Sequence, residues 1–181
     1  MEIRYGKIKL RALEPEDMEA LRATINDPDM ERMVVGWSFP ISRQQQLDWY
    51  GRIMGNNNNQ RFAVEYQGNF VGVSTLTDID WKNRSAFHGV KLTADTPKGK
   101  GIGFDAVAAV MKYAFEDLQL NRLYGGILEY NIPSQKLYKK CGWKIEGRYR
   151  QCVFKDNAYH DELAVAILRD EYFEWKKTIG E

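Results

Sequence analysis

The sequence predicts an α+β fold, in which helices are layered on a mixed, mostly antiparallel sheet. Three observations indicate this fold class. Segments with helical spacing of apolar residues are interleaved with segments in which apolar and polar residues alternate. Tight turns at residues 68–69 and 156–157 separate two pairs of strand-like segments, which is typical of antiparallel hairpins. In the middle of the chain, a strand-like segment leads through a glycine-rich turn directly into a helix.

The first part of the chain predicts one strand and two helices. Residues 7–13 alternate apolar and polar side chains, as a half-buried strand does. Pro15 stands at a favourable first-turn position of a helix that should end at residues 26–28. An aromatic loop follows, and Ser42 with Gln45 forms a capping box for the second helix.

The next part predicts a polar loop, a hairpin and a strand. Residues 56–59 form a polar run of low complexity that should be a loop. Apolar residues alternate on both sides of the turn at 68–69, so residues 61–77 should form a hairpin. Residues 86–92 predict a further strand, which leads to the glycine-rich turn.

The second half predicts further helices and strands. After the glycine-rich turn, apolar residues recur at helical spacing, so this helix should be buried along one face. Residues 123–128 predict a strand, and Asn131 should cap a short helix that Gly142 ends. Residues 143–154 and 159–168 should form a C-terminal hairpin, followed by a last helix.

Length, charge and cysteine content limit the class of protein. A chain of 181 residues fits one domain, residues 1–181, with a buried core. Its 26 basic and 25 acidic residues are interspersed, which argues against nucleic acid and against a membrane surface as partners. No apolar run resembles a signal peptide or a membrane span, so we expect a cytoplasmic protein. Cys141 and Cys152 lack metal-site or redox spacing, which predicts reduced structural thiols and no metal.

The glycine-rich turn has the composition of an anion-binding site. It reads K-G-K-G-I-G over residues 98–103. Glycines allow a backbone too tight for side chains, so several N–H groups can point at one anion at the positive end of the helix dipole. The expected ligand is a pyrophosphate. Taken alone, such a turn is also explained as a structural helix cap.

A second motif favours the ligand-binding interpretation. It reads N-I-P-S-Q-K-L-Y-K-K-C-G-W over residues 131–143. Together the two motifs resemble those of the GNAT family of N-acetyltransferases. In that family a Gln/Arg-x-x-Gly-x-Gly/Ala turn holds the pyrophosphate of coenzyme A, and an Asn-x-x-Ser-x-x-Leu-Tyr-x-x-x-Gly-Phe segment lies beside its pantetheine arm. Lys98 replaces the usual Gln or Arg, and Trp143 replaces the usual Phe; both keep the character of the side chain.

The resemblance implies helices on both faces of the sheet and an acetyl transfer from acetyl-CoA, with no metal. It also implies that the strand before the turn separates from its neighbour and holds pantetheine through its backbone. The implied coenzyme A-binding residues are Val90, Leu92, Lys98, Gly99, Lys100, Gly101, Ile102, Gly103, Asn131, Ser134 and Tyr138. Asn131 is explained equally well as a helix cap, and Ser134 as a first-turn residue.

Acetyl transfer from a thioester to an amine needs a base, an oxyanion donor and an acid. Tyr138 is the predicted acid, because the ordinary pKa of tyrosine, about 10, lies near the value of about 8.5 for a thiol. Its position also matches a tyrosine that many GNAT enzymes use in this way. The alternative is a tyrosine that only packs in the core. A backbone N–H of Val90 or Leu92 is the expected oxyanion donor.

The base is open between three alternatives. His88 lies on the strand that enters the site and ordinarily titrates near neutrality, although a lone histidine on a strand is often structural. Glu129 stands at the end of the next strand and is comparable. A chain of water molecules is the third alternative.

The acceptor is expected to be a primary amine of a small molecule. Residues 37–50 and 146–156 resemble the GNAT subgroup that acetylates amino-sugar nucleotides, which is the preferred substrate class. The candidate substrate-binding residues, chosen as stacking rings or as partners of charged groups, are Trp37, Phe39, Trp81, Arg148 and Asp161.

Other functions stay open at this point. Spermidine or other polyamine acetyltransferases and ribosomal-protein N-terminal acetyltransferases have the same plan. A regulatory protein that binds coenzyme A without catalysis is an alternative of another class. Related enzymes are often dimers and the fold exposes strand edges, so a homodimer is an open alternative to a monomer.

Overall fold

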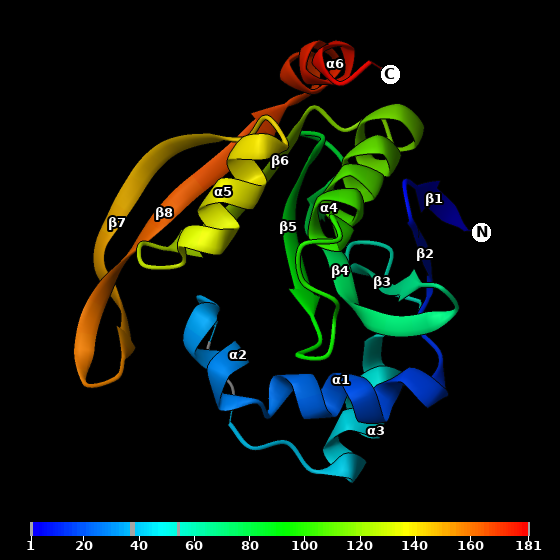
Figure 1. Cartoon of the computed structure of the whole chain (residues 1–181), viewed down its shortest axis with the longest axis vertical. Helices are drawn as coiled ribbons and strands as arrows, with labels where there is room; N and C mark the ends of the chain where they lie inside the picture. Colours follow the sequence, from blue (N-terminus) through cyan, green and yellow to red (C-terminus); the bar gives the residue numbers. More distant parts are fainter. Residues whose placement is uncertain (1, 37–38, 54, 181) are drawn as a thin grey trace.

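The chain forms an eight-stranded sheet with the strand order β1-β2-β3-β4-β5-β6-β8-β7 (Figure 1). The computed structural model describes residues 2–36, 39–53 and 55–180. The strands are β1 (Ile3–Tyr5), β2 (Ile8–Ala12), β3 (Gln60–Tyr66), β4 (Asn69–Asp80), β5 (Ser85–Leu92), β6 (Arg122–Leu128), β7 (Lys144–Lys155) and β8 (Ala158–Leu168). Neighbouring strands are antiparallel except β5 and β6, which confirms the expected mixed sheet.

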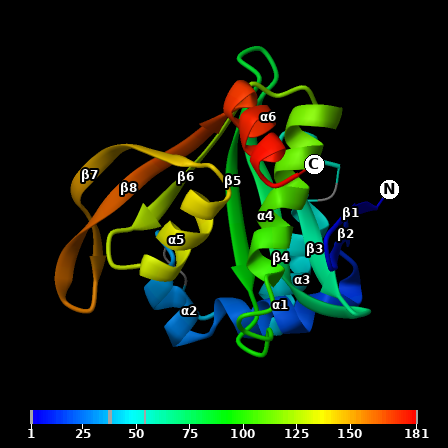
Figure 2. The same cartoon turned by 45° about the horizontal axis from the view of Figure 1, so that its top comes forward.

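Helices cover both faces of this sheet, as expected (Figures 1 and 2). They are α1 (Met18–Ile25), α2 (Pro28–Met33), α3 (Arg43–Ile53), α4 (Ile102–Lys112), α5 (Ile132–Lys140) and α6 (Arg169–Thr178). A 3-10 turn precedes α1, and a π-helical turn prolongs α4. Among the described residues, no helix combines the length and the apolar character that crossing a membrane requires.

The sheet divides the apolar core into two clusters. Val64 and Leu76 belong to the larger one, together with α4, in which residues 106–111 are all fully buried. Ala63 and Val73 belong to the smaller one, together with α1 and α3. Since successive residues of a strand point to opposite faces, α4 and the pair α1 and α3 lie on opposite sides of the sheet.

The sheet opens between β5 and β6. These two strands pair only at their starts, where residues 85–87 face residues 122–124. Beyond this point β5 continues against β4 alone, and β6 continues against β8. Figure 1 shows the two halves diverging, with α5 beside β6. The resemblance had implied this separation.

Two elements were not expected from the sequence: β1 and α2. Residues 26–28 do end α1, but the carboxylate of Asp27 then accepts the backbone N–H groups of Asp29 and Met30 and caps α2. Pro28 occupies the first turn of α2, where its missing N–H costs nothing. The same residues therefore stop one helix and start another. The capping box of Ser42 and Gln45 is present at α3, as predicted.

Candidate active site

A cavity of about 520 Å³ lies where β5 and β6 separate. Its walls include Leu21 of α1 and Trp49 of α3 on one face of the sheet, and Ser134 and Tyr138 of α5 on the other. The cavity therefore passes through the sheet. Of the residues predicted from the sequence, it brings together His88, Val90, Asn131, Ser134 and Tyr138.

Tyr138 lines this cavity from a buried position. Its ring packs edge-on against Trp143, with 4.9 Å between ring centroids, and lies 5.8 Å from the ring of His88. Burial raises the pKa of Tyr138 well above its ordinary value. The phenol therefore keeps its proton at neutral pH, which is the form that a general acid needs.

His88 lines the cavity and contacts the backbone through one of its two ring nitrogens. Nδ1 lies 3.0 Å from the carbonyl oxygen of Thr75; since a carbonyl only accepts, Nδ1 carries the proton and Nε2 the lone pair. Within the described part of the chain, Nε2 of His88 is the buried side-chain polar atom that lacks a hydrogen-bond partner. Burial lowers the pKa of His88 to about 4. His88 is therefore a weak base for an ammonium group.

The backbone of β5 offers N–H groups to the opening. The N–H of Thr93 donates to the carbonyl of Val71, and the carbonyl of Gly89 accepts the hydroxyl of Thr75, so the odd-numbered residues of β5 direct their backbone groups toward β4. Backbone groups alternate sides along a strand. The N–H groups of Val90 and Leu92 therefore face the opening, in the position that the resemblance assigned to pantetheine and the oxyanion.

The glycine-rich turn ends at the N-terminus of α4. Gly99 and Gly101 have φ angles of +73° and +81°, in the left-handed region that favours glycine. Gly101 is the N-cap residue of α4, and no side chain caps this end of the helix in the described structure. The first-turn N–H groups of α4, including that of Gly103, are therefore available to an anion. Lys98 and Lys100 are exposed beside them.

Gly101→Val should weaken the binding of coenzyme A at least tenfold. A β-branched residue at this φ costs about 1–2 kcal/mol of backbone strain and moves the first-turn N–H groups. The matched control is Gly68→Val, because Gly68 has a φ of +80° in the β3–β4 turn and equally open surroundings. Calorimetric titration with coenzyme A compares the two variants. Equal affinity in both would mean that the turn is only a helix cap.

Asn131 uses both ends of its amide within the protein. Its oxygen accepts the backbone N–H of Ser134 and caps α5, and its nitrogen donates to the carbonyl of Met33 at 2.7 Å. The capping alternative therefore accounts for Asn131. The second hydrogen bond fixes α2 and the residues after it, 28–36, which we call the α2 strap.

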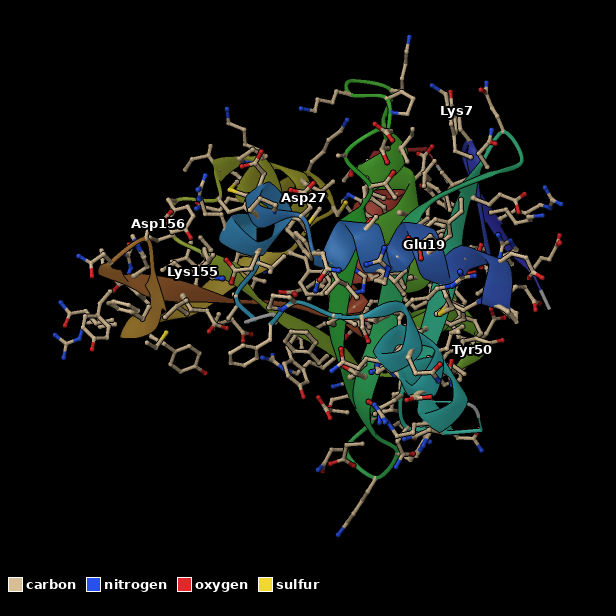
Figure 3. All side chains as sticks on the ribbon, turned by 90° about the horizontal axis from the view of Figure 1, so that it is seen from below. Lys7, Glu19, Asp27, Tyr50, Lys155 and Asp156 are labelled. Atoms are coloured by element: carbon tan, nitrogen blue, oxygen red, sulfur yellow. The ribbon has the colours of Figure 1, made fainter. Side chains whose placement is uncertain are left out.

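The α2 strap forms one wall of the cavity through residues 33–36. Its outer side is held by the β7–β8 hairpin: Lys155 pairs with the Glu31 carboxylate and donates to the carbonyl of Gly36, and Arg32 pairs with Asp156 at 3.1 Å. Figure 3 shows Lys155 and Asp156 on this hairpin beside α2. Residues far apart in the sequence thus close the cavity.

Three charged residues predicted for the site instead neutralise one another outside it. Arg148 lies 2.9 Å from Asp161 and 3.4 Å from Glu129, and Glu129 also lies 3.4 Å from His160. Glu129, Arg148 and Asp161 are not among the described residues that line the cavity. The structure therefore does not bring Glu129 to the position of a base beside Tyr138.

The predicted aromatic residues are also not brought to the cavity. Trp81 lies in the β4–β5 turn, where its indole N–H donates to Asn58 at 2.8 Å. Phe39 is 67% exposed before α3. Neither lines the cavity in the described structure, and Trp37 lies outside the described residues.

The sequence interpretation missed three charged residues that line the cavity: Arg61, Lys91 and Glu162. The guanidinium of Arg61 lies 5.5 Å from the ring centroid of Trp49. Burial lowers the pKa values of Arg61 and Lys91 and raises that of Glu162. The sequence signal for these residues was a charged side chain within a mainly apolar strand. This signal is ambiguous, because a strand with one solvent-facing side also carries charged side chains.

The fold and the site define an acyltransferase that uses acetyl-CoA. A family profile described as an acetyltransferase (GNAT) domain matches residues 7–144, and the chain belongs to this family. It is an acetyl-CoA-dependent N-acetyltransferase.

Individual relatives match over most of their length. A prophage-derived, uncharacterised N-acetyltransferase of Bacillus subtilis (strain 168) is 28% identical over 166 residues, covering 91% of this chain and 92% of the relative. The spermidine N(1)-acetyltransferase of Escherichia coli (strain K12) is 27% identical over 175 residues, covering 96% of this chain and 92% of the relative. Among solved structures, spermidine N-acetyltransferase from Vibrio cholerae in complex with CoA and spermine superposes with a TM-score of 0.86 at 26% identity, covering 92% of this chain and 98% of the other.

Proposed function

We propose that the enzyme transfers the acetyl group directly to a primary amine of a small molecule, and that Tyr138 protonates the leaving thiolate. The observation that carries this proposal is the shape of the cavity. Tyr138 and the open backbone edge of β5 line the same cavity that reaches α1 and α3 through the sheet. A thioester on one face and an amine on the other would meet between β5 and β6.

Direct transfer is also supported by the state of Cys141. Burial raises the pKa of this thiol to about 12, so very little of the nucleophilic thiolate exists at neutral pH. An acetyl-enzyme intermediate on Cys141 is therefore disfavoured. The acceptor amine itself is the better nucleophile.

We further propose that the acceptor carries one reactive ammonium group and an anionic or hydroxyl-rich remainder, as an amino-sugar nucleotide does. Arg61 and Lys91 place two cationic side chains in the cavity, against one carboxylate from Glu162. Two cations attract an anionic remainder and repel the additional ammonium groups of a polyamine. One carboxylate suffices for one ammonium group.

A polyamine is the second candidate acceptor, because the similar proteins include spermidine N-acetyltransferases. Release of coenzyme A from acetyl-CoA across a panel of UDP-amino-sugars, polyamines, aminoglycosides and peptide N-termini separates the two candidates. We expect selective turnover of an amino-sugar nucleotide. Selective turnover of spermidine would contradict that expectation, and tight binding of acetyl-CoA without any turnover would favour the regulatory alternative.

A further inference from the structure

We propose that Glu162 binds the ammonium group of the acceptor and takes the proton that this group must lose before it attacks. The proposal rests on the proposed transfer to a primary amine. Glu162 lies on β8, opposite Leu128 of β6, and lines the same cavity as Tyr138 and His88. The sequence analysis named other candidates for the base.

The fold makes room for this carboxylate. A β-carbon at position 126 of β6 would overlap Oε1 of Glu162. The carboxylate can therefore occupy its position only because residue 126 is a glycine. Gly126 itself also lines the cavity. The carboxylate is therefore seated in the wall of the cavity.

The carboxylate has no cationic partner in the described part of the chain. Nearby, Asp161 pairs with Arg148, and Glu129 pairs with Arg148 and His160. For Glu162, the polar contact is the Cys152 thiol, 3.9 Å from Oε2. A half-buried carboxylate without a counter-ion is complementary to a cation of the ligand.

Burial changes Glu162 in the direction that a base requires. It raises the pKa of the carboxyl group, because the charged form is less well solvated than in water. A carboxylate with a raised pKa accepts a proton more readily than an ordinary one. His88 is changed in the opposite direction, since burial lowers its pKa.

Glu162 also lies where a second hollow adjoins the first. This hollow has a volume of about 520 Å³. Its lining includes Glu162, the aromatic rings of Phe87, Tyr124 and Tyr149, the predicted substrate residue Arg148, and the ion pair of Arg122 with Glu146. Phe87 and Glu162 line both spaces. An acceptor whose ammonium group meets Glu162 therefore has room to place its remainder against aromatic rings.

The step balances in protons and electrons with Glu162, Tyr138 and solvent. Glu162 takes one proton from the ammonium group, and the free amine attacks the thioester carbon. The new C–N bond forms, the C–S bond breaks, and Tyr138 gives its proton to the sulfur. The acylated nitrogen loses its extra proton to solvent, Tyr138 regains a proton from solvent, and Glu162 releases its own.

Glu162→Gln tests the proposal because it preserves volume and removes the charge. We expect kcat/KM for the acceptor to fall by about 10²-fold or more, with both kcat and KM affected, while the affinity for coenzyme A is unchanged. Glu162→Asp should retain part of the activity. The control is Glu174→Gln, a charge removal on the exposed side of α6, which should match the wild type.

Two further comparisons keep this test separate from that of the proposed function. A wild-type enzyme without turnover on the amine panel contradicts the proposed function. Calorimetric titration of the same amines into the coenzyme A-bound protein then still tests Glu162, and equal binding by wild type and Glu162→Gln would overturn its role. So would an activity loss that follows Glu129→Gln and spares Glu162→Gln.

Discussion

Tyr138→Phe should lower kcat by about 10²- to 10⁴-fold, which is the usual contribution of a positioned general acid. The substitution removes only the hydroxyl group, and the packing of the ring against Trp143 and His88 stays. Affinity for acetyl-CoA should not change, because the groups expected to bind the pyrophosphate and the carbonyl are backbone N–H groups of the glycine-rich turn and of β5. Steady-state kinetics combined with calorimetric binding of coenzyme A separates the two effects.

Tyr113→Phe is the matched control for this experiment. Tyr113 is also a buried tyrosine whose pKa is raised by burial, but it packs against Phe62 and is not among the described residues that line the cavity. Its loss should leave kcat near the wild-type value. If Tyr138→Phe also turned over at the wild-type rate, the leaving thiolate would need no proton from this phenol.

The folded protein should lose about 3 kcal/mol of stability through His88 as the pH falls from 6.5 to 4. The pKa of His88 is about 4 in the folded protein, against an ordinary value of 6.5, and each unit of difference corresponds to about 1.4 kcal/mol. Because the folded pKa is lowered, the unfolded chain binds the proton first. The contribution of His88 is therefore complete above pH 6.5 and is lost toward pH 4.

Urea unfolding at pH 7 and pH 4 measures this loss. Other groups also titrate in this range, so the informative quantity is the difference between the wild type and His88→Gln, whose side chain does not titrate. We expect the variant to lose about 3 kcal/mol less between the two pH values. An equal loss in both proteins would mean that His88 does not gain a proton on unfolding in this pH range, which would contradict the lowered pKa of the folded protein.

Local sequence motifs predicted the glycine-rich turn and the helix that carries Tyr138 well. The turn that ends at Gly101 and the helix that carries Tyr138 are each specified by neighbouring residues, through glycine conformation and helix capping. Pro28 shows the limit of such signals. It was interpreted as the end of a helix, whereas Asp27 beside it also starts the next one.

The charged and aromatic residues that line the cavity were predicted poorly, because its lining depends on contacts between distant segments. Glu162 faces the cavity only because β6 pairs with β8 in one register and separates from β5. Glu129 stands at the predicted strand end, but Arg148 and His160 hold its carboxylate elsewhere. Trp81 has suitable chemistry for stacking and lies in a turn outside the cavity wall. No local pattern contains this information.

The α2 strap has a consequence for the order in which the site assembles. Its hydrogen bonds to Tyr130, Asn131 and Lys155 join residues 98, 98, 119 and 124 positions apart in the sequence. Closing such long loops costs entropy before any contact compensates for it, and contacts of high sequence separation form slowly. We therefore expect the strap wall of the cavity to form late in folding. During synthesis, a chain whose residue 155 has not yet emerged lacks the contacts of Lys155 with Glu31 and Gly36, so this wall of the cavity is completed only after the β7–β8 hairpin is made.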